Sequence, residues 1–347
     1  RAKLMAPSPV EENKWVKVTD YIRIHHLRDP LLVTNRGPKK EGYTYCTKCG
    51  LIEPSVDPNG SVGAAHRKPF PDERDPNCKG GGASTGIVLG TDFITDVLLI
   101  SIRVTSPMVL MPGSLATHIV LRTLSEAITK AACSIMDLEL NELQAEYRPA
   151  LNPHGQTGME AEIYIYDTLP GGAGFVRRIG QLGKVIFDAA LKILEICPDN
   201  CDRSCYRCLR SYRNKFEHDL LDRHLGASLL RFLLSGKFVF DESILGKSYD
   251  LLFQDLSRQN VQGVKFSRNE KIKIPKIGQF EAPILISRNG KDDFFVILHH
   301  PLTPRMPHND QLKSLKKILS PSLLFIEDEL VIRRSLPRAS SGIIKAC

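Results

Sequence analysis

The most constraining feature of this chain is a group of four cysteines in one short stretch. Cys197, Cys201, Cys205 and Cys208 lie within twelve residues, and the whole chain has only nine cysteines. Four thiolates at about 2.3 Å from one zinc ion make a closed tetrahedral shell with no vacant position. The sequence therefore predicts a structural zinc site, which organises a surface and does not activate a substrate.

Two disulfide bonds are the alternative use of these four cysteines. Disulfide frameworks are typical of short secreted chains with a signal peptide. This chain has 347 residues, and its first residues lack the apolar core of such a peptide. No run approaches the roughly 18 apolar residues of a membrane-spanning helix. We therefore expect a reducing cytoplasmic location without a membrane partner, and the missing initiator methionine suggests a piece of a longer polypeptide.

A second cysteine pair predicts another zinc knuckle near the N-terminus. Cys46 and Cys49 have the spacing that lets two thiolates reach one ion, and Gly50 permits the tight turn that follows. His66 and Cys78 are the best candidates for the remaining two ligands, and the segment between them is rich in Pro, Gly and Asp. The long intervals leave a metal-free, degenerate knuckle as the alternative.

Basic residues are concentrated around the four-cysteine group. They are Arg203, Arg207, Arg210, Arg213 and Lys215, and no carboxylate lies between the first of them and Phe216. The whole chain carries a formal net charge of +8. A positive patch on a rigid knuckle suits phosphate, so nucleic acid is the first expected partner and an acidic protein surface the second.

The order of the expected elements is typical of an α/β fold with a mixed sheet. We expect strands at 87–104, 138–147 and 160–166, and a helix at 115–136 capped by Ser114. Helices at 175–196 and 219–234 flank the four-cysteine group, so the zinc would clamp a helix pair. Further strands are expected at 280–286 and 293–298, with a strand pair at 323–333. The expected domains are residues 1–84 with N-terminal strands and a knuckle, 85–236 as the α/β domain, and 237–347 as a small, β-rich C-terminal α/β unit.

A glycine-rich loop joins the expected strand at 160–166 to the helix that follows. Its glycines, Gly171, Gly172 and Gly174, could expose backbone N–H groups that hold a phosphate at the helix N-terminus. The loop matches neither a P-loop nor a dinucleotide-binding fingerprint in its spacing. A tight turn that needs glycine torsions is the simpler interpretation, and both remain open.

A nuclease is the catalytic alternative. Glu281 lies in an expected strand of the C-terminal unit, and His299 and His300 follow the next strand. No lysine occupies the position after a strand carboxylate, so a degenerate unit or a purely structural one is favoured over an active one.

Four motifs follow one another along the chain: Thr95-Asp-Val-Leu98, the loop Pro170 to Gly174, the four cysteines and Leu221-Asp-Arg223. Together they resemble the MrfA-type zinc-binding domain. The resemblance covers about residues 85–234. It implies zinc ligation by Cys197, Cys201, Cys205 and Cys208, and the Cys46, Cys49, His66 and Cys78 set resembles the extra knuckle of longer members. The chain departs from the pattern in having no helicase motor of its own, and no cysteine follows Cys208 until Cys347.

This family lies behind the motor of superfamily 2 DNA helicases of the mitomycin-repair kind and in antiphage defence proteins such as the DISARM component DrmB and the Druantia helicase. The resemblance implies a non-catalytic accessory module that binds DNA or docks a helicase motor, in antiphage defence or DNA repair. The motor would lie in the same polypeptide or in a separate subunit. A scaffold without DNA contact is the remaining alternative.

Overall fold

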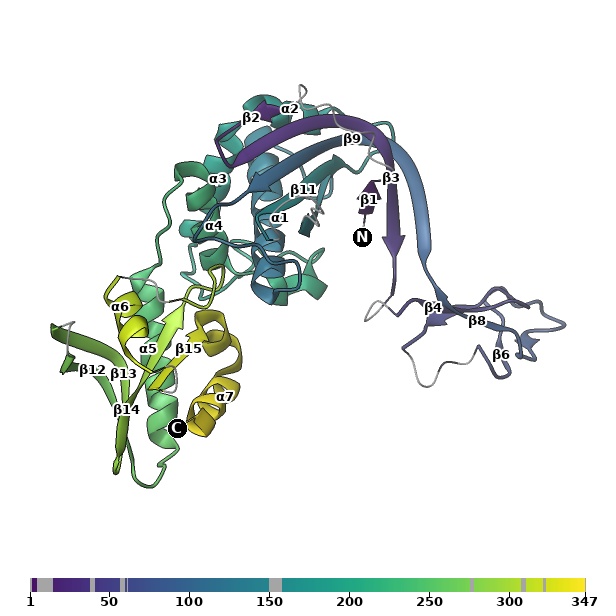
Figure 1. Cartoon of the computed structure of the whole chain (residues 1–347). Coiled ribbons are helices and arrows are strands. Elements are labelled where there is room, and N and C mark those ends of the chain that lie inside the picture. Colours follow the sequence, from purple (N-terminus) through teal and green to yellow (C-terminus); the bar gives the residue numbers. More distant parts are fainter. Residues whose placement is uncertain are drawn as a thin grey trace.

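The structure is a computed structural model that describes residues 2–4, 15–37, 41–56, 60, 62–149, 158–274, 278–306, 310–320 and 323–346. It has three parts: a central body, an extended N-terminal arm and a C-terminal unit (Figure 1). The described parts combine sheets with helices, as the sequence predicts. The mixed sheet lies in the C-terminal unit, whereas the central sheet is antiparallel throughout.

The central sheet has the strand order β1-β3-β9-β11-β10, with β2 paired to β3. Its strands are β1 (Ala2–Leu4), β2 (Val16–Lys17), β3 (Ile22–Asn35), β9 (Leu89–Arg103), β10 (Leu143–Pro149) and β11 (Glu160–Asp167). The long pair β3 and β9 runs in register from Ile22 opposite Ile102 to Asn35 opposite Leu89. Strand β10 is shorter than expected, because residues 138–142 form a turn after the preceding helix.

Both faces of the central sheet are covered in the middle of β9. Leu98, Ile100 and Ile102 pack into the main core, whereas Val97 and Leu99 join a smaller cluster on the opposite face. Side chains alternate between the faces of a strand, so burial of five apolar residues in this short stretch requires cover on both sides. The β-branched run in the sequence therefore marks the centre of the fold.

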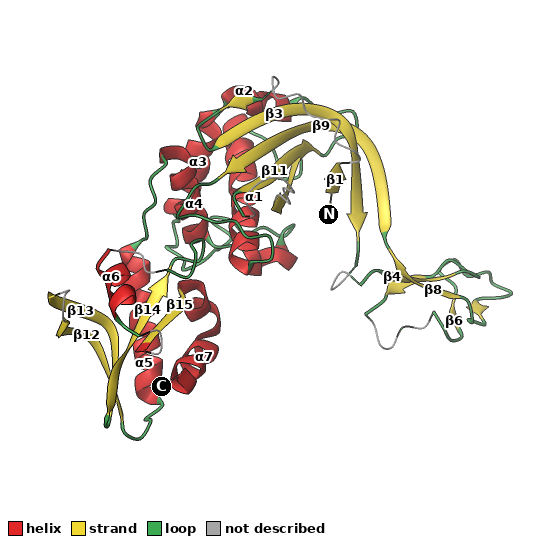
Figure 2. Cartoon of the chain, viewed as in Figure 1, coloured by secondary structure: helices red, strands yellow, loops and turns green. Residues whose placement is uncertain are grey.

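Helices α1, α3 and α4 gather on one side of the central sheet (Figure 2). The helices of this part are α1 (Leu115–Met136), α2 (Phe175–Leu182), α3 (Lys184–Glu195), the 3-10 turn η3 (Lys215–Leu220) and α4 (Arg223–Ser235). Helix α1 has the expected bounds, but the Ser114 side chain makes no capping hydrogen bond. The single helix expected at 175–196 is divided, because Gly183 takes non-helical torsions between α2 and α3.

The N-terminal arm is formed by the ends of β3 and β9 that leave the central body (Figure 1). It carries β4 (Tyr43–Cys46), β5 (Ile52–Pro54), β6 (His66–Arg67), β7 (Asn77–Cys78) and β8 (Ala83–Ile87). Because β3 pairs with β9 along its whole length, the central sheet crosses the domain boundary expected between residues 84 and 85. The pairing of β3 with β9 joins segments that are far apart in the chain, and local composition does not encode such a pairing.

The C-terminal unit is a four-stranded sheet packed against helices. It contains α5 (Glu242–Arg258), β12 (Val264–Ile274), β13 (Gly278–Arg288), β14 (Lys291–His299), α6 (Asp310–Ile318), β15 (Leu324–Asp328) and α7 (Glu329–Ala346). Strand β15 is parallel to β14, and the other pairs are antiparallel. Of the strand pair expected at 323–333, the first strand is present as β15, but the second is wrong: the Asp328 carboxylate accepts the N–H of Leu330 (2.8 Å), and a helix begins.

Candidate metal centres and basic surface

The four-cysteine group has the geometry of a zinc site. Its thiols lie between the end of α3 and η3. The sulfur atom of Cys197 is 3.6 Å from the sulfur of Cys201 and 3.5 Å from that of Cys205. The sulfur of Cys208 is 3.6 Å from Cys201 and 3.7 Å from Cys205. Sulfurs at the corners of a tetrahedron with 2.3 Å zinc bonds are about 3.8 Å apart. The spacing therefore fits one zinc ion held by four thiolates.

Backbone N–H groups of the loop favour the thiolate form at one of these cysteines. Burial raises the pKa of Cys197, but the N–H groups of Cys201 and Asp199 and the adjacent thiols outweigh it and lower the pKa to about 6. The pKa of Cys201 is raised, by burial first and then by its thiol neighbours. Closely spaced thiolates repel one another, so a cation at the centre is what allows all four to ionise together.

Arg223, at the start of α4, ties the four-cysteine loop to the helix before it. Its Nε donates to the carbonyl of Cys201 (2.7 Å), and its Nη2 donates to the side chain of Asn200 (3.1 Å). Its Nη1 reaches the last carbonyls of α3, those of Leu194 (3.2 Å) and Glu195 (3.1 Å). A buried guanidinium thus satisfies carbonyls that a helix C-terminus leaves unpaired. This gives the Leu221-Asp-Arg223 motif a physical role.

Asp222, immediately before Arg223, links the central body to the C-terminal unit. Its fully buried carboxylate caps α4 by accepting the N–H of Leu225 (3.1 Å). The same carboxylate pairs with Arg333 of α7 (2.6 Å), whose guanidinium also bonds Glu329 (2.6 Å). Because removing one member of a buried ion pair leaves an uncompensated charge, this contact is sensitive to substitution.

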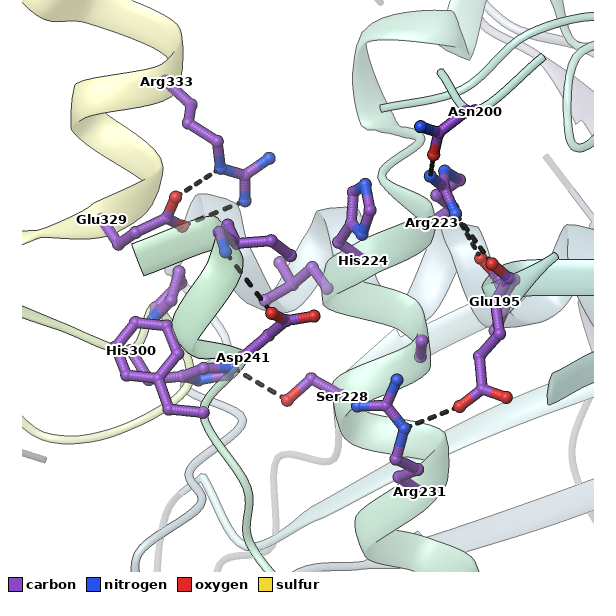
Figure 3. Close-up of a pocket in the computed structure, with 16 residues that line it drawn as sticks. Glu195, Asn200, Arg223, His224, Ser228, Arg231, Asp241, His300, Glu329 and Arg333 are labelled. Atoms are coloured by element: carbon purple, nitrogen blue, oxygen red, sulfur yellow. Dashed lines mark hydrogen bonds and ion pairs between the residues drawn. The ribbon is translucent and has the colours of Figure 1, made fainter. Parts of the chain in front are cut away.

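A polar pocket of about 270 Å³ lies at this junction (Figure 3). Helix α4 provides Arg223, His224, Ser228 and Arg231 on one side, and the other side includes Asp241, His300 and residues of α7. Its polar groups bond largely with each other, as Arg231 does with Glu195 (2.7 Å) and Ser228 with His300 (2.9 Å). The pocket therefore belongs to the contact between the central body and the C-terminal unit, and its polar groups do not converge on a substrate position.

The N-terminal knuckle brings its four expected ligands together. The sulfurs of Cys46 and Cys78 are 3.9 Å apart, and the Cys49 sulfur is 3.1 Å from Nε2 of His66. Nδ1 of His66 lies 2.8 Å from the carbonyl of Ala64. This contact assigns the proton to Nδ1 and leaves the Nε2 lone pair facing the other ligands, as zinc requires.

The turn chemistry of this knuckle also favours a metal. Gly50 has φ +82°, as expected for a knuckle turn, and its N–H donates to the Cys46 carbonyl (2.9 Å). Burial raises the pKa of Cys46, but the N–H groups of Cys49 and Lys48 and the adjacent thiols lower it to about 7. The donor set of three thiols and one imidazole is a common structural zinc shell. The residues therefore fit a second zinc ion.

The five basic residues beside the four-cysteine group are not equivalent. Arg207, Arg213 and Lys215 are exposed, whereas Arg203 and Arg210 are half-buried. The Nε of Arg210 donates to the hydroxyl of Ser204 (3.0 Å). Three of the five cations are therefore exposed to solvent.

Tertiary contacts modify the charge of this patch. Asp199, which precedes the carboxylate-free stretch in the sequence, lies 3.5 Å from the guanidinium of Arg207. Arg213 donates to the carbonyl of Leu140, which lies in the turn between α1 and β10. The positive patch exists, but one of its charges is partly compensated by a residue that the sequence pattern did not include.

Sequence reasoning missed three exposed aromatic side chains in the same segment. Tyr206, Tyr212 and Phe216 are 64%, 75% and 90% exposed. The signal was present, because the three rings are interspersed among the basic residues between positions 203 and 216. Aromatic residues interleaved with basic ones are a known pattern of nucleic-acid surfaces.

The glycine-rich loop is a tight turn, and its helix N-terminus is already filled. The carboxylate of Asp167 accepts the N–H groups of Ala173 (2.7 Å), Phe175 (3.2 Å) and Val176 (3.1 Å). These are the donors that a phosphate would need, so the phosphate interpretation of Gly171, Gly172 and Gly174 is wrong.

Positive φ angles explain why the loop contains glycine. Gly171, Gly172 and Gly174 have φ of +91°, +75° and +79°. A Cβ on Gly172 would also lie 2.4 Å from a carboxylate oxygen of Asp96. The loop therefore brings the start of α2 close against β9, where no side chain fits.

The residues of the nuclease alternative do not form a catalytic group. His300 is buried between Phe238 and Phe240, and its Nδ1 accepts the N–H of Leu302 (3.1 Å). His299 is also buried, with its Nδ1 on the carbonyl of His300 (3.0 Å). Among the residues that the structure describes, the two knuckles are the groups of His, Cys, Asp and Glu able to hold a metal, and neither includes Glu281.

No helix in the described ranges combines the length and the apolar character that crossing a membrane requires.

A comparison with protein families matches the four-cysteine region. The family model of the MrfA Zn-binding domain matches residues 124–209, from the middle of α1 to just beyond Cys208. The Druantia protein DruE of Escherichia coli (strain UMEA 4076-1) is 34% identical in an alignment 248 residues long, which covers 66% of this chain and 13% of that protein.

A crystal structure of the DUF1998 helicase MrfA bound to DNA is also similar, with 13% identity and a TM-score of 0.37. The match covers 67% of this chain and 24% of that one. This chain thus spans only a small part of the proteins it resembles. Together with the four thiols arranged around one point, the family match shows that this chain contains an MrfA-type zinc-binding domain.

Proposed function

We propose that this chain is the non-catalytic accessory part of a superfamily 2 DNA helicase, acting in the cytoplasm in antiphage defence or DNA repair. The similarity to a Druantia protein supports the defence role. The resemblance of the zinc-binding domain to MrfA-type domains supports a place beside a helicase motor. The chain would brace that motor and guide the nucleic acid.

The observation that carries this proposal is the closed four-thiol site below an exposed basic surface. Four protein ligands leave zinc no position for a water or substrate, so the metal supplies shape and not chemistry. The loop around it presents Arg207, Arg213 and Lys215 to solvent. Basic side chains on a rigid support bind the nucleic-acid backbone through phosphate contacts, which tolerate any base sequence.

The test is the salt dependence of DNA binding by the 347-residue chain. Replacing Arg207, Arg213 and Lys215 together by Gln should weaken binding and lower the slope of log K against log salt by about 2 to 3, because each lost phosphate contact removes 0.7 to 0.9. Fluorescence anisotropy with a labelled oligonucleotide measures both quantities.

A matched variant controls for the change in net charge. Lys265, Lys271 and Lys273 are exposed on β12 of the C-terminal unit, so their replacement by Gln removes the same three charges away from the knuckle. This control should bind like the parent chain. If the variant without Arg207, Arg213 and Lys215 binds DNA as tightly as the parent chain at all salt concentrations, DNA binding by this basic surface is contradicted. A protein scaffold is then favoured.

A further inference from the structure

The aromatic side chains beside the four-cysteine site form one exposed surface. In the described part of the chain four aromatic side chains are largely exposed, and Tyr206, Tyr212 and Phe216 are three of them. Apolar rings are normally buried, and an exposed group of them marks an interaction site. We name these three rings together with Arg207, Arg213 and Lys215 the aromatic-basic surface.

The rings are connected through cations and polar contacts. The Nζ of Lys215 lies 4.0 Å from the centroid of the Tyr212 ring and 5.0 Å from that of Phe216. The Tyr206 ring packs edge-on against His218, with centroids 5.5 Å apart. Nε2 of His218 is 3.1 Å from the carbonyl of Ser211, next to Tyr212. The three rings therefore lie along one continuous stretch of surface.

The support below this surface is rigid. Tyr206 lies between two zinc-ligand positions, Cys205 and Cys208. The buried side chain of Asn214 accepts the N–H of Ser211 (2.8 Å) and donates to the carboxylate of Glu126 on α1 (3.0 Å). Glu217 in η3 forms an ion pair with Arg122 of α1. A ligand that binds here would order few groups, which favours affinity.

We infer that the aromatic-basic surface binds single-stranded nucleic acid by stacking unpaired bases on the three rings. Every base has a flat face that an exposed ring can cover, and each phosphate can meet a neighbouring cation. A duplex hides these faces in its own stack and offers mainly its phosphates to such a surface. The inference rests on the proposed function and adds the strand preference.

The experiment separates stacking from charge. We replace Tyr206, Tyr212 and Phe216 by Leu in the 347-residue chain, which keeps the net charge. Binding to labelled oligothymidine, to an abasic strand of equal length and to a duplex is measured by anisotropy at one salt concentration. Because one stacked base is worth about a factor of ten or more in affinity, the variant should lose at least tenfold on oligothymidine. Its affinity for the duplex should stay within about twofold.

Two controls keep the result interpretable. Phe70, near the N-terminal knuckle, is also 90% exposed, so Phe70→Leu removes an equally exposed ring elsewhere and should bind like the parent. The abasic strand retains the phosphates, so the parent chain should bind it as weakly as the leucine variant binds oligothymidine. Zinc content and melting of the variant show whether it is folded, and the abasic comparison needs no variant.

The outcomes distinguish this inference from the proposed function. Equal affinity of the parent chain for abasic and intact strands, or equal losses on strand and duplex in the leucine variant, would overturn stacking while DNA binding through charge remains. If the parent chain binds neither strand nor duplex, the proposed DNA binding fails and the inference fails with it.

Discussion

At the scale of single residues, Arg223 has a larger structural role than its position suggests. It is 4% exposed and bonds only neutral oxygens, from the end of α3 and from the four-cysteine loop. The zinc shell orders the loop, and Arg223 holds the ordered loop against the helices. Zinc alone would therefore not determine how α3 and α4 are placed.

We expect Arg223→Gln to lower the free energy of unfolding by more than about 3 kcal/mol, because several buried carbonyls lose a charged donor at once. Arg231→Gln is the matched control on the same helix. Arg231 pairs with Glu195 in a partly exposed ion pair, so its loss should cost at most about 1 kcal/mol. Urea unfolding of both variants measures the difference, and similar losses would contradict the role assigned to Arg223.

At the scale of elements, the two knuckles stabilise parts of different size. The four-cysteine loop packs against the main core, which includes Cys208 and Leu209. The N-terminal knuckle has a separate small cluster of Cys46, Val62 and Cys78 at the end of the arm. A cluster this small cannot hold a fold without its metal.

The purified chain should contain two zinc ions, because the structure has two sets of four ligands. Cys46→Ser should remove one ion and leave the main melting transition unchanged. Cys205→Ser should remove the other ion and lower that transition, since its loop is part of the central body. Elemental analysis with calorimetry tests both, and an unchanged zinc content in Cys46→Ser would contradict the N-terminal site.

At the scale of the whole molecule, a buried polar contact joins the central body to the C-terminal unit. Asp222 of α4 pairs with Arg333 of α7 (2.6 Å), and Ser228 of α4 bonds His300 (2.9 Å). Burial lowers the pKa of His300 to about 3, and the charges of His299 and Arg333 act in the same direction. The imidazole at the contact is therefore neutral in the folded chain.

This contact should weaken in acid. The unfolded His300 takes up a proton near pH 6.5, whereas the folded one does so only near pH 3, so stability is present above pH 6.5 and falls as the pH drops toward 3. His300→Gln should flatten the pH dependence of the unfolding free energy in this window by up to about 1.4 kcal/mol per pH unit. Ser228→Ala keeps the imidazole and should retain the parental slope. Equal slopes for the parent chain and His300→Gln would contradict a neutral His300 at the contact.

The sequence by itself determined the features that depend on neighbouring residues. The cysteine spacing predicted where four thiols gather, because ligands a few residues apart reach one ion without help from the fold. The apolar periodicity predicted α1 at its observed bounds, and glycines marked the turns at Gly50 and in the loop before α2. Zinc and the MrfA-type resemblance follow from these local patterns.

The tertiary structure alone decided which distant groups meet. The pairing of β3 with β9 joins segments on either side of the N-terminal knuckle, and it extends the central sheet across an expected domain boundary. Asp167 reaches the N–H groups of α2 and removes the phosphate site, and Asp199 reaches Arg207 and alters the basic patch. The packing of the chain decides which group a buried carboxylate or an exposed cation meets. A sequence pattern does not contain the spatial distance between residues that are far apart in the chain.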